Sequence, residues 1–435
     1  MWPMECIEHK RDGKVLSREE IRRFIDDYTA GRVADYQAAA WLMAVYLQGM
    51  NAAETTDLTM TMAHSGDMID LSSIPGVKVD KHSTGGIADT TTLIVAPLAA
   101  AAGVPVAKMS GRGLGFTGGT ADKLESIPGY QTVLPETAFL EQVRRIGISL
   151  ITQSGDIAPA DKLLYALRDA TGTVESIPLI ASSIMSKKIA AGADAIVLDV
   201  KYGDGAFMKN KKDARTLAHT MVQIGKLAHR PTVAILTSME APLGTAIGNS
   251  LEVDEAVEAL SGKGPKRLME VVEVLGAYML LLGKKAVDEA DGREKIRRVL
   301  QSGAGLAKFK ELIAAQHGST SWIGKRPLTQ AAQQYTAVCT DEGYITAIHG
   351  RALGEIAMKL GAGRAHKEDA IDQMVGIRLY KELYDPIRAG EPLFTIYGKA
   401  DTPMMAVAQE IADQIIVTPT QVASIEPVVC DVIYE

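Results

Sequence analysis

The sequence predicts an α/β protein built from three parts: a small helical domain that is discontinuous in sequence, a larger α/β domain with a mainly parallel central sheet, and a C-terminal α+β domain. The observations behind this are helical patterns before about residue 65, short β-branched runs alternating with helical stretches from residue 75, and alternating residues around turns after about residue 333. We place the domains at 1–68 with 160–191, at 69–159 with 192–332, and at 333–435.

The composition is that of an ordinary folded protein. The chain has 435 residues, 47% hydrophobic and 23% charged, which gives ample core for two or three domains. Its 46 basic and 53 acidic side chains give a net charge of −7, which argues against a general nucleic-acid binder. We expect its three scattered cysteines to be reduced thiols in a cytoplasmic protein. The longest uncharged apolar stretch, 93–107, is broken by prolines, and the N-terminus lacks a secretory signal, so we expect no membrane partner.

Capping signals predict the first helices. Ser17 with Glu20, and Asn51 with Glu54, have the spacing at which two side chains cap the start of a helix reciprocally. Apolar residues at i, i+3, i+4 and i+7 from Ile21 form one buried helical face. Further helices are expected over about 35–48 and 51–64.

Short apolar runs predict the strands of the α/β domain. They are GVKVDK, VPVAKM, ISLITQ, AIVLDV and TVAILT, separated by glycine-rich turns and helical stretches. Such alternation implies a parallel sheet, with the chemistry at the carboxyl ends of its strands. The strongly helical segment 161–191 interrupts the series, and we expect it to pack back onto the N-terminal helices.

Two glycine-rich loops follow predicted strands and precede predicted helices. The first runs from Lys81 to Gly86 and leads to a helix start near Thr92, and the second spans 110–120. Glycines let a backbone approach a ligand, and amides at a helix start attract an anion. Neither loop is a Walker A motif or a dinucleotide fingerprint, and either one alone could be a structural turn. Together they favour a phosphate site, with an ammonium and hydroxyls supplied by Lys81, Ser83, Thr92, Ser110 and Thr120.

A third cluster lies in the interrupting helical segment. Ser183 and Lys187 are four residues apart and share one helix face, and Arg168 precedes them. Their donors suit a heterocycle with two carbonyls flanking an N–H, as in uracil or thymine. From these residues alone, a solvated basic face is the favoured interpretation.

With the three clusters assembled, the chain resembles the thymidine and pyrimidine-nucleoside phosphorylases. The block SGRGLGFTGGTADKLESIPG looks like that family's signature. It is accompanied, in the family's order, by VDKHSTGGIADTTT, ALRDATGTVESIPLIASSIMSKKIA, LDVKYGDGAFMK and APLGTAIGNSLEVDEA. The resemblance covers essentially the whole chain.

The resemblance implies a homodimer that carries out reversible phosphorolysis of pyrimidine nucleosides, with phosphate as co-substrate and no organic cofactor. It implies a phosphate site at Lys81, His82, Ser83, Thr92, Lys108, Met109, Ser110 and Thr120. It places the pyrimidine at Arg168, Ser183 and Lys187. Catalysis is assigned to His82, Arg168 and Lys187; His82 gives the base a proton or hydrogen bond, or alternatively only orders its loop.

Two finer expectations come from the same resemblance. Thymidine-selective relatives commonly have an uncharged residue where this chain has Lys108, so uridine should be accepted as well as thymidine and deoxyuridine. Bacterial relatives also have a potassium site made mostly of main-chain oxygens, which maps to Ala88, Thr90, Leu243, Ala246 and Glu255.

Three alternatives stay open at this point. The first is a thymidine-selective phosphorylase. The second is an anthranilate-type phosphoribosyltransferase, which normally lacks a C-terminal domain such as the last 100 or so residues here. The third is a non-catalytic binding protein on the same scaffold, against which the intact charged cluster argues.

Overall fold

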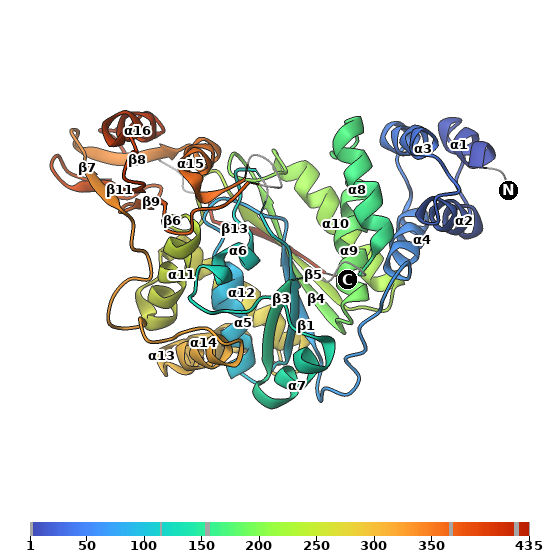
Figure 1. The fold of residues 1–435 in the computed structure, drawn as a ribbon, viewed down its shortest axis with the longest axis horizontal. Helices are drawn as coiled ribbons and strands as arrows, with labels where there is room; N and C mark the ends of the chain where they lie inside the picture. Colours follow the sequence, from blue (N-terminus) through green and yellow to red (C-terminus); the bar gives the residue numbers. More distant parts are fainter. Residues whose placement is uncertain (1–2, 114, 153–156, 365–368, 422–425, 435) are drawn as a thin grey trace.

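The computed structural model describes residues 3–113, 115–152, 157–364, 369–421 and 426–434. Leu114 of the second glycine-rich loop therefore lies outside the described residues, as do residues 365–368. Figure 1 shows a helical unit at one end of the molecule, a sheet with its helices in the middle, and a smaller β-rich part at the other end.

The helical unit combines two separate stretches of chain. Both predicted capping boxes are confirmed, at Ser17 with Glu20 and at Asn51 with Glu54. The stretch that interrupts the strand series packs on these N-terminal helices, where Leu164 and Leu179 join the core around Trp41. The helices are α1 (Pro3–Arg11), α2 (Arg18–Thr29), α3 (Asp35–Gln48), α4 (Ala52–Ala63), α8 (Pro159–Thr171) and α9 (Ile177–Ala190).

The central sheet has the order β1-β4-β5-β13, and its first three strands are parallel. A separate parallel pair, β2 with β3, lies beside β1. All five predicted strands are confirmed. The strands are β1 (Val79–Ser83), β2 (Val106–Ser110), β3 (Ile148–Thr152), β4 (Ala195–Tyr202), β5 (Thr232–Ser238) and β6 (Ala246–Ile247). The helices of this part are α5 (Thr91–Ala101), α6 (Thr120–Glu125), α7 (Glu136–Ile146), α10 (Lys211–Leu227), α11 (Asn249–Glu258), η1 (Ala259–Lys263), α12 (Lys266–Leu282), α13 (Glu289–Gln301) and α14 (Ala304–Ala315).

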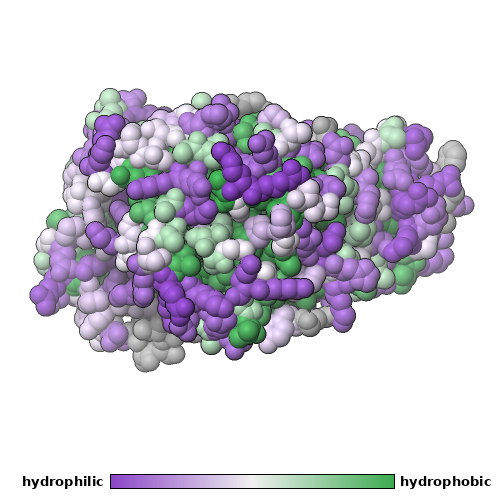
Figure 2. All heavy atoms as spheres, turned by 90° about the horizontal axis from the view of Figure 1, so that it is seen from below, coloured by the Kyte–Doolittle hydropathy of each residue, from purple (hydrophilic) through white to green (hydrophobic). Residues whose placement is uncertain are grey.

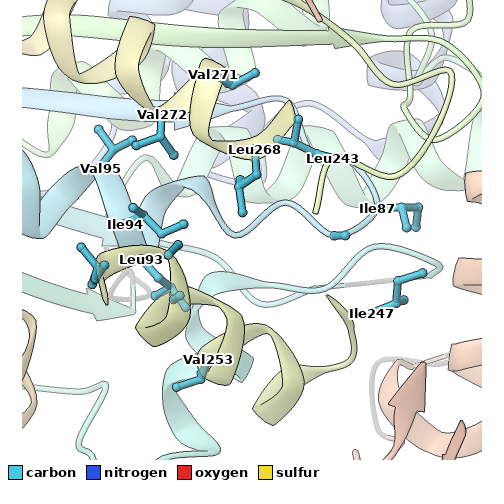
Figure 3. Close-up of a cluster of buried hydrophobic side chains, with 14 of the residues drawn as sticks. Ile87, Leu93, Ile94, Val95, Leu243, Ile247, Val253, Leu268, Val271 and Val272 are labelled. Atoms are coloured by element: carbon cyan, nitrogen blue, oxygen red, sulfur yellow. The ribbon is translucent and has the colours of Figure 1, made fainter. Parts of the chain in front are cut away.

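Helix α5 is buried on almost all sides, which fixes the position of its N-terminus. Every residue from Thr91 to Ala100 is buried. Figure 3 shows its apolar side chains among those of α11 and α12, at Leu93, Ile94, Val95, Val253, Leu268, Val271 and Val272. Because close-packed cores resist displacement, the threonines at the start of α5 are held rigidly beside β1.

The C-terminal part contains two small antiparallel sheets, of order β6-β9-β11-β7 and β10-β8-β12. Its elements are β7 (Gln333–Val338), β8 (Gly343–Ile348), α15 (Gly350–Ala357), η2 (Met358–Ala362), β9 (Gly376–Leu379), β10 (Pro386–Ile387), β11 (Pro392–Gly398), α16 (Met404–Ala412), β12 (Ile415–Thr418) and β13 (Val429–Ile433). One expectation needs correction: β13 does not belong to a domain over 333–435, because it pairs antiparallel with β5. It covers the hydrogen-bonding edge of the central sheet, which would otherwise be exposed.

In the part of the chain that the structure describes, no helix is both long and apolar enough to cross a bilayer. On the face seen from below, hydrophilic side chains lie around and between separate hydrophobic patches (Figure 2).

Candidate active site

Lys81 lies on β1 and contacts the first turn of α5. Its buried ammonium donates to the hydroxyl of Thr91, lies 3.4 Å from that of Thr92, and lies 3.5 Å from Oδ2 of Asp199. Burial lowers the pKa of Lys81. A cation and two hydroxyls at a helix N-terminus form a favourable site for an anion such as phosphate.

The hydroxyl of Ser83, at the end of β1, is turned toward Asp89. It donates to Oδ2 of Asp89 over 2.5 Å and accepts the N–H of Gly85 at 3.1 Å. Gly85 has a φ of +93°, in the left-handed region that glycine tolerates without strain. The first loop is thus a tight turn shaped by Ser83 and Asp89.

A buried charge network that the sequence analysis missed supports Lys81. Oδ2 of Asp199 lies 3.0 Å from the ammonium of Lys201, and its Oδ1 accepts the hydroxyl of Thr237 at 2.8 Å. Burial opposes ionisation of Asp89, but the ammonium groups of Lys201 and Lys81 hold the pKa of Asp89 far below its ordinary value. A sequence signal existed, because Asp199 and Lys201 are charges inside an apolar run that forms a wholly buried strand.

The second glycine-rich loop closes on itself. A Cβ on Gly119 would collide with the backbone nitrogen of Gly113, so the two ends of the loop are in backbone contact. The carboxylate of Asp122 accepts the N–H of Gly113 at 2.7 Å. The loop starts at Ser110, the last residue of β2, and ends at Thr120, the first residue of α6, and both are half-buried.

Lys108 lies buried beside Asp80 of β1. Its ammonium donates to the main-chain oxygen of Lys81 over 2.5 Å and to Oδ1 of Asp80 over 3.3 Å. Burial, together with the nearby ammonium groups of Lys188 and Lys81, lowers the pKa of Lys108 to about 7. Asp80 also pairs with Lys188, whose ammonium lies 2.9 Å from its Oδ2 and donates to the main-chain oxygen of Met109 over 3.2 Å. The Lys108 ammonium and the main-chain oxygen of Met109 therefore both make hydrogen bonds within the protein.

His82 is half-buried between these lysines. Burial, and then the ammonium groups of Lys188 and Lys108, lower its pKa well below the ordinary value for histidine. The ring is consequently neutral at neutral pH, a state that can offer one N–H as a hydrogen-bond donor but holds no imidazolium proton.

The residues predicted to bind the base, Arg168, Ser183 and Lys187, lie on α8 and α9. The Lys187 ammonium donates to the Ser183 hydroxyl over 2.9 Å, as the four-residue spacing predicted. It also donates to Oδ2 of Asp161 over 2.6 Å, a partner on α8 that the sequence did not reveal. Arg168 is buried, and its guanidinium donates to the main-chain oxygens of residues 173, 174 and 179. Arg168 thus orders the connection between α8 and α9 while its remaining N–H groups can serve a ligand.

Lys188 joins the two halves of the site. It follows Lys187 on α9, and its contacts with Asp80 and the main-chain oxygen of Met109 tie that helix to β1 and β2. The Lys188 side chain therefore links the helix that carries the predicted base-binding residues to the strands whose carboxyl ends carry the predicted phosphate-binding residues.

The five residues mapped to the potassium site lie together. Glu255 is fully buried and accepts the Thr90 hydroxyl at 3.0 Å and the amide of Ala246 at 3.1 Å. Ala88 has a positive φ of 55°, and its main-chain oxygen accepts the N–H of Gly244, which follows Leu243. Burial raises the pKa of Glu255. The guanidinium of Arg378, which pairs with Glu258, opposes that rise. A buried carboxylate among hydroxyl and main-chain oxygens is the kind of oxygen-rich environment that fits a hard cation.

Three family models match the chain in sequence order. They are "Glycosyl transferase family, helical bundle domain" over residues 4–66, "Glycosyl transferase family, a/b domain" over 76–306, and "Pyrimidine nucleoside phosphorylase C-terminal domain" over 344–418.

A solved structure shares the fold. Anthranilate phosphoribosyltransferase from Thermus thermophilus superimposes with a TM-score of 0.60 at 20% identity, covering 72% of this chain and 99% of that one. At this identity the likeness concerns the fold alone.

Curated relatives match at high identity over nearly the whole chain. The pyrimidine-nucleoside phosphorylase of Geobacillus stearothermophilus is 51% identical over 96% of this chain and 97% of its own. Those of Bacillus subtilis (strain 168) and Staphylococcus aureus (strain MSSA476) are 52% and 54% identical, over 93% and 91% of this chain and 94% and 92% of theirs. The chain therefore belongs to the glycosyl transferase family and, within it, to the pyrimidine-nucleoside phosphorylases.

Proposed function

We propose that this protein catalyses the reversible phosphorolysis of pyrimidine nucleosides to a free base and a pentose 1-phosphate. The observation that carries the proposal is the contact of α9 with β1 and β2 through Lys188, which sets the Lys187 cluster against the anion-binding ends of those strands. The names of the relatives, all pyrimidine-nucleoside phosphorylases, support the same activity.

The charge distribution fits the chemistry. A phosphate oxygen attacks the anomeric carbon while the bond from that carbon to the ring nitrogen breaks, and the bonding electrons move onto the base. Lys187 and Arg168 stabilise the negative charge that collects on the base carbonyls, and Lys81 with the α5 N-terminus positions the phosphate. His82, being neutral, contributes a hydrogen bond to the base. Groups on two parts of the molecule must meet at one bond, so we expect the helical unit and the α/β part to move closer together when substrates bind.

The test is release of base from nucleoside. We expect uracil from uridine and thymine from thymidine, dependent on phosphate and independent of magnesium or a diphosphorylated sugar. No release from either nucleoside at saturating phosphate would refute the proposal. Activity only with a diphosphorylated sugar would instead indicate a phosphoribosyltransferase.

We further propose that Lys108 favours ribose over deoxyribose, with its remaining N–H directed to the 2′-hydroxyl. The lowered pKa means that Lys108 is charged below about pH 7 and neutral above it. The ratio of kcat/KM for uridine to that for deoxyuridine should therefore fall several-fold from pH 6 to pH 8.5 in the wild type. In Lys108→Met the ratio should be low and flat with pH, whereas Lys162→Met, a change at an exposed position of α8, should keep the wild-type profile. An unchanged ratio in Lys108→Met would contradict the assignment.

We propose potassium as the occupant of the Glu255 site. A ligand present at about 100 times its Kd stabilises a folded protein by about 2.7 kcal/mol. Potassium chloride should therefore raise Tm above that in tetramethylammonium chloride, and Glu255→Gln should abolish the difference because the buried charge is removed. Glu273→Gln, at a carboxylate paired with Arg297 on the surface, should retain it. An equal response in both variants would argue against the site.

We propose a cytoplasmic homodimer whose interface includes an apolar face on α3 and α8. Its exposed apolar side chains are Tyr36, Met43, Tyr46, Leu47, Leu163 and Tyr165. Leu47, 72% exposed, should be covered by the second copy, so Leu47→Glu should halve the mass measured by sedimentation. Val287→Glu changes an 83% exposed position in the connection between α12 and α13, and this variant should remain dimeric. A dimer that survives Leu47→Glu would place the interface elsewhere.

A further inference from the structure

The second glycine-rich loop is held from outside by the C-terminal part of the chain. The N–H of Gly115 donates to the main-chain oxygen of Arg364 over 3.0 Å. Nη1 of the Arg364 guanidinium lies 2.9 Å from Oδ1 of Asp122 and 3.4 Å from the main-chain oxygen of Gly113. Arg364 therefore contacts the loop at Gly113 and at Gly115, and also contacts Asp122 in the first turn of α6.

Asp122 transmits this contact to the inside of the loop. Its carboxylate is 1% exposed, and its Oδ2 accepts the N–H of Gly113 at 2.7 Å. Arg112 also lies 3.3 Å from Asp122, but its side chain is 47% exposed and makes its bidentate contact with Glu125 instead. Arg364 is only 13% exposed, so it is the better-shielded counterion of Asp122.

Close packing fixes the segment that presents Arg364. A Cβ on Gly354 of α15 would lie 2.7 Å from the main-chain oxygen of Phe116 and would collide with Cδ1 of Ile87. A Cβ on Gly363 would lie 3.0 Å from the main-chain oxygen of Gly115. The backbone around Gly354 and Gly363 therefore packs directly against the backbone of the second glycine-rich loop. This close packing fixes the position from which Arg364 reaches the loop.

We propose that Arg364 is a positioning residue of the phosphate site: through Asp122 and Gly113 it holds the second glycine-rich loop, which runs from Ser110 to Thr120, in its closed shape. This inference rests on the proposed phosphorolysis. It gives the C-terminal part a role in the reaction, since Arg364 is the closer and better-shielded of the two cationic groups that offset the buried charge of Asp122.

The experiment compares the full-length Arg364→Met variant with the wild type for kcat, for KM of phosphate and uridine separately, and for Tm. Loss of a charge-assisted hydrogen bond should raise the KM for phosphate by about tenfold or more, while the KM for uridine stays within about twofold. Arg388→Met, an exposed arginine in the same part of the chain, should match the wild type. Arg364→Lys keeps the charge beside Asp122 but not the fork of donors, and should give an intermediate KM for phosphate.

A second variant separates loop positioning from folding. Asp122→Asn removes the charge that Arg364 serves, so the double variant Asp122→Asn with Arg364→Met should raise the KM for phosphate no further than the larger single change. Additive effects of the two changes, equal increases in both KM values, or a phosphate KM within twofold of wild type would overturn the proposal. Wild-type protein that releases no base would refute the phosphorolysis itself, which is a distinguishable result.

Discussion

We expect Lys187→Ala to lower kcat by about 10²–10³-fold while the chain stays folded. The ammonium is held in place before substrate arrives, because it donates to Ser183 and to Asp161 at once. A preoriented donor stabilises charge that develops only in the transition state, so its loss falls mainly on kcat. Steady-state kinetics with uridine and thymidine, together with a thermal unfolding curve, measure both parts of this expectation.

Lys162→Ala is the matched control, because Lys162 is exposed on α8 next to Asp161. It should leave kcat unchanged. Ser183→Ala should lower kcat less than Lys187→Ala, because the Asp161 carboxylate still orients the ammonium. A folded Lys187→Ala enzyme with near-normal kcat would remove the role we assign to this lysine.

Local sequence signals were sufficient for the helices and for one part of the site. A capping box is decided by residues three positions apart, and the pairs at Ser17 and Asn51 formed as the spacing predicted. Ser183 and Lys187 are four residues apart, about one helical turn, so the sequence predicted that they share one helix face. The alternation of strands and helices was enough to predict a parallel sheet and to place the chemistry at its carboxyl ends.

Contacts between distant segments could not be predicted in the same way. Asp161 and Lys187 are 26 residues apart, and Asp80 and Lys188 come from different domains of the sequence-based division. The return of β13 to the edge of β5 depends on which strand edge is left open, a property of the assembled sheet. Each of these contacts is decided by tertiary structure, and no local pattern encodes it.

Charge balance explains how so many lysines can be buried in one place. Lys81 and Lys201, both buried, share Asp199, and the half-buried Lys187 has Asp161. Each carboxylate offsets part of the cost of taking an ammonium out of water. The net charge of −7 conceals this concentration of cationic groups. Binding of a phosphate dianion near Lys81 would favour its charged form, so burial and ligand act on its pKa in opposite directions.

Asp80 is likewise a buried carboxylate shared by two lysines, and we expect Asp80→Asn to lower the free energy of unfolding by about 3–5 kcal/mol at pH 6. It is buried between Lys108 and Lys188, whose ammonium groups lie 3.3 and 2.9 Å from its two oxygens. Asparagine keeps the shape and removes the charge, so two buried ammonium groups lose their shared counterion. Asp194→Asn is the control: Asp194 pairs with Lys78 at 2.8 Å but is 38% exposed, and its loss should cost about 1 kcal/mol or less.

The pH dependence distinguishes this electrostatic cause from a packing defect. Lys108 titrates at about pH 7 in the folded protein, below the value of about 10.4 for an unfolded chain. Without Asp80, which raises it, that folded-state pKa falls further. In Asp80→Asn the unfolded chain therefore binds more protons than the folded one from a pH below 7 upward, whereas in the wild type this begins only near pH 7. The stability of the variant accordingly starts to rise at a lower pH than that of the wild type. The deficit of Asp80→Asn should therefore be largest near pH 6, shrink as the pH passes the pKa of Lys108 at about 7, and level off toward pH 9, in denaturant unfolding series. Adding Lys108→Met should restore stability at pH 6, whereas a deficit that is constant from pH 6 to pH 9 would show that the carboxylate is needed for packing alone.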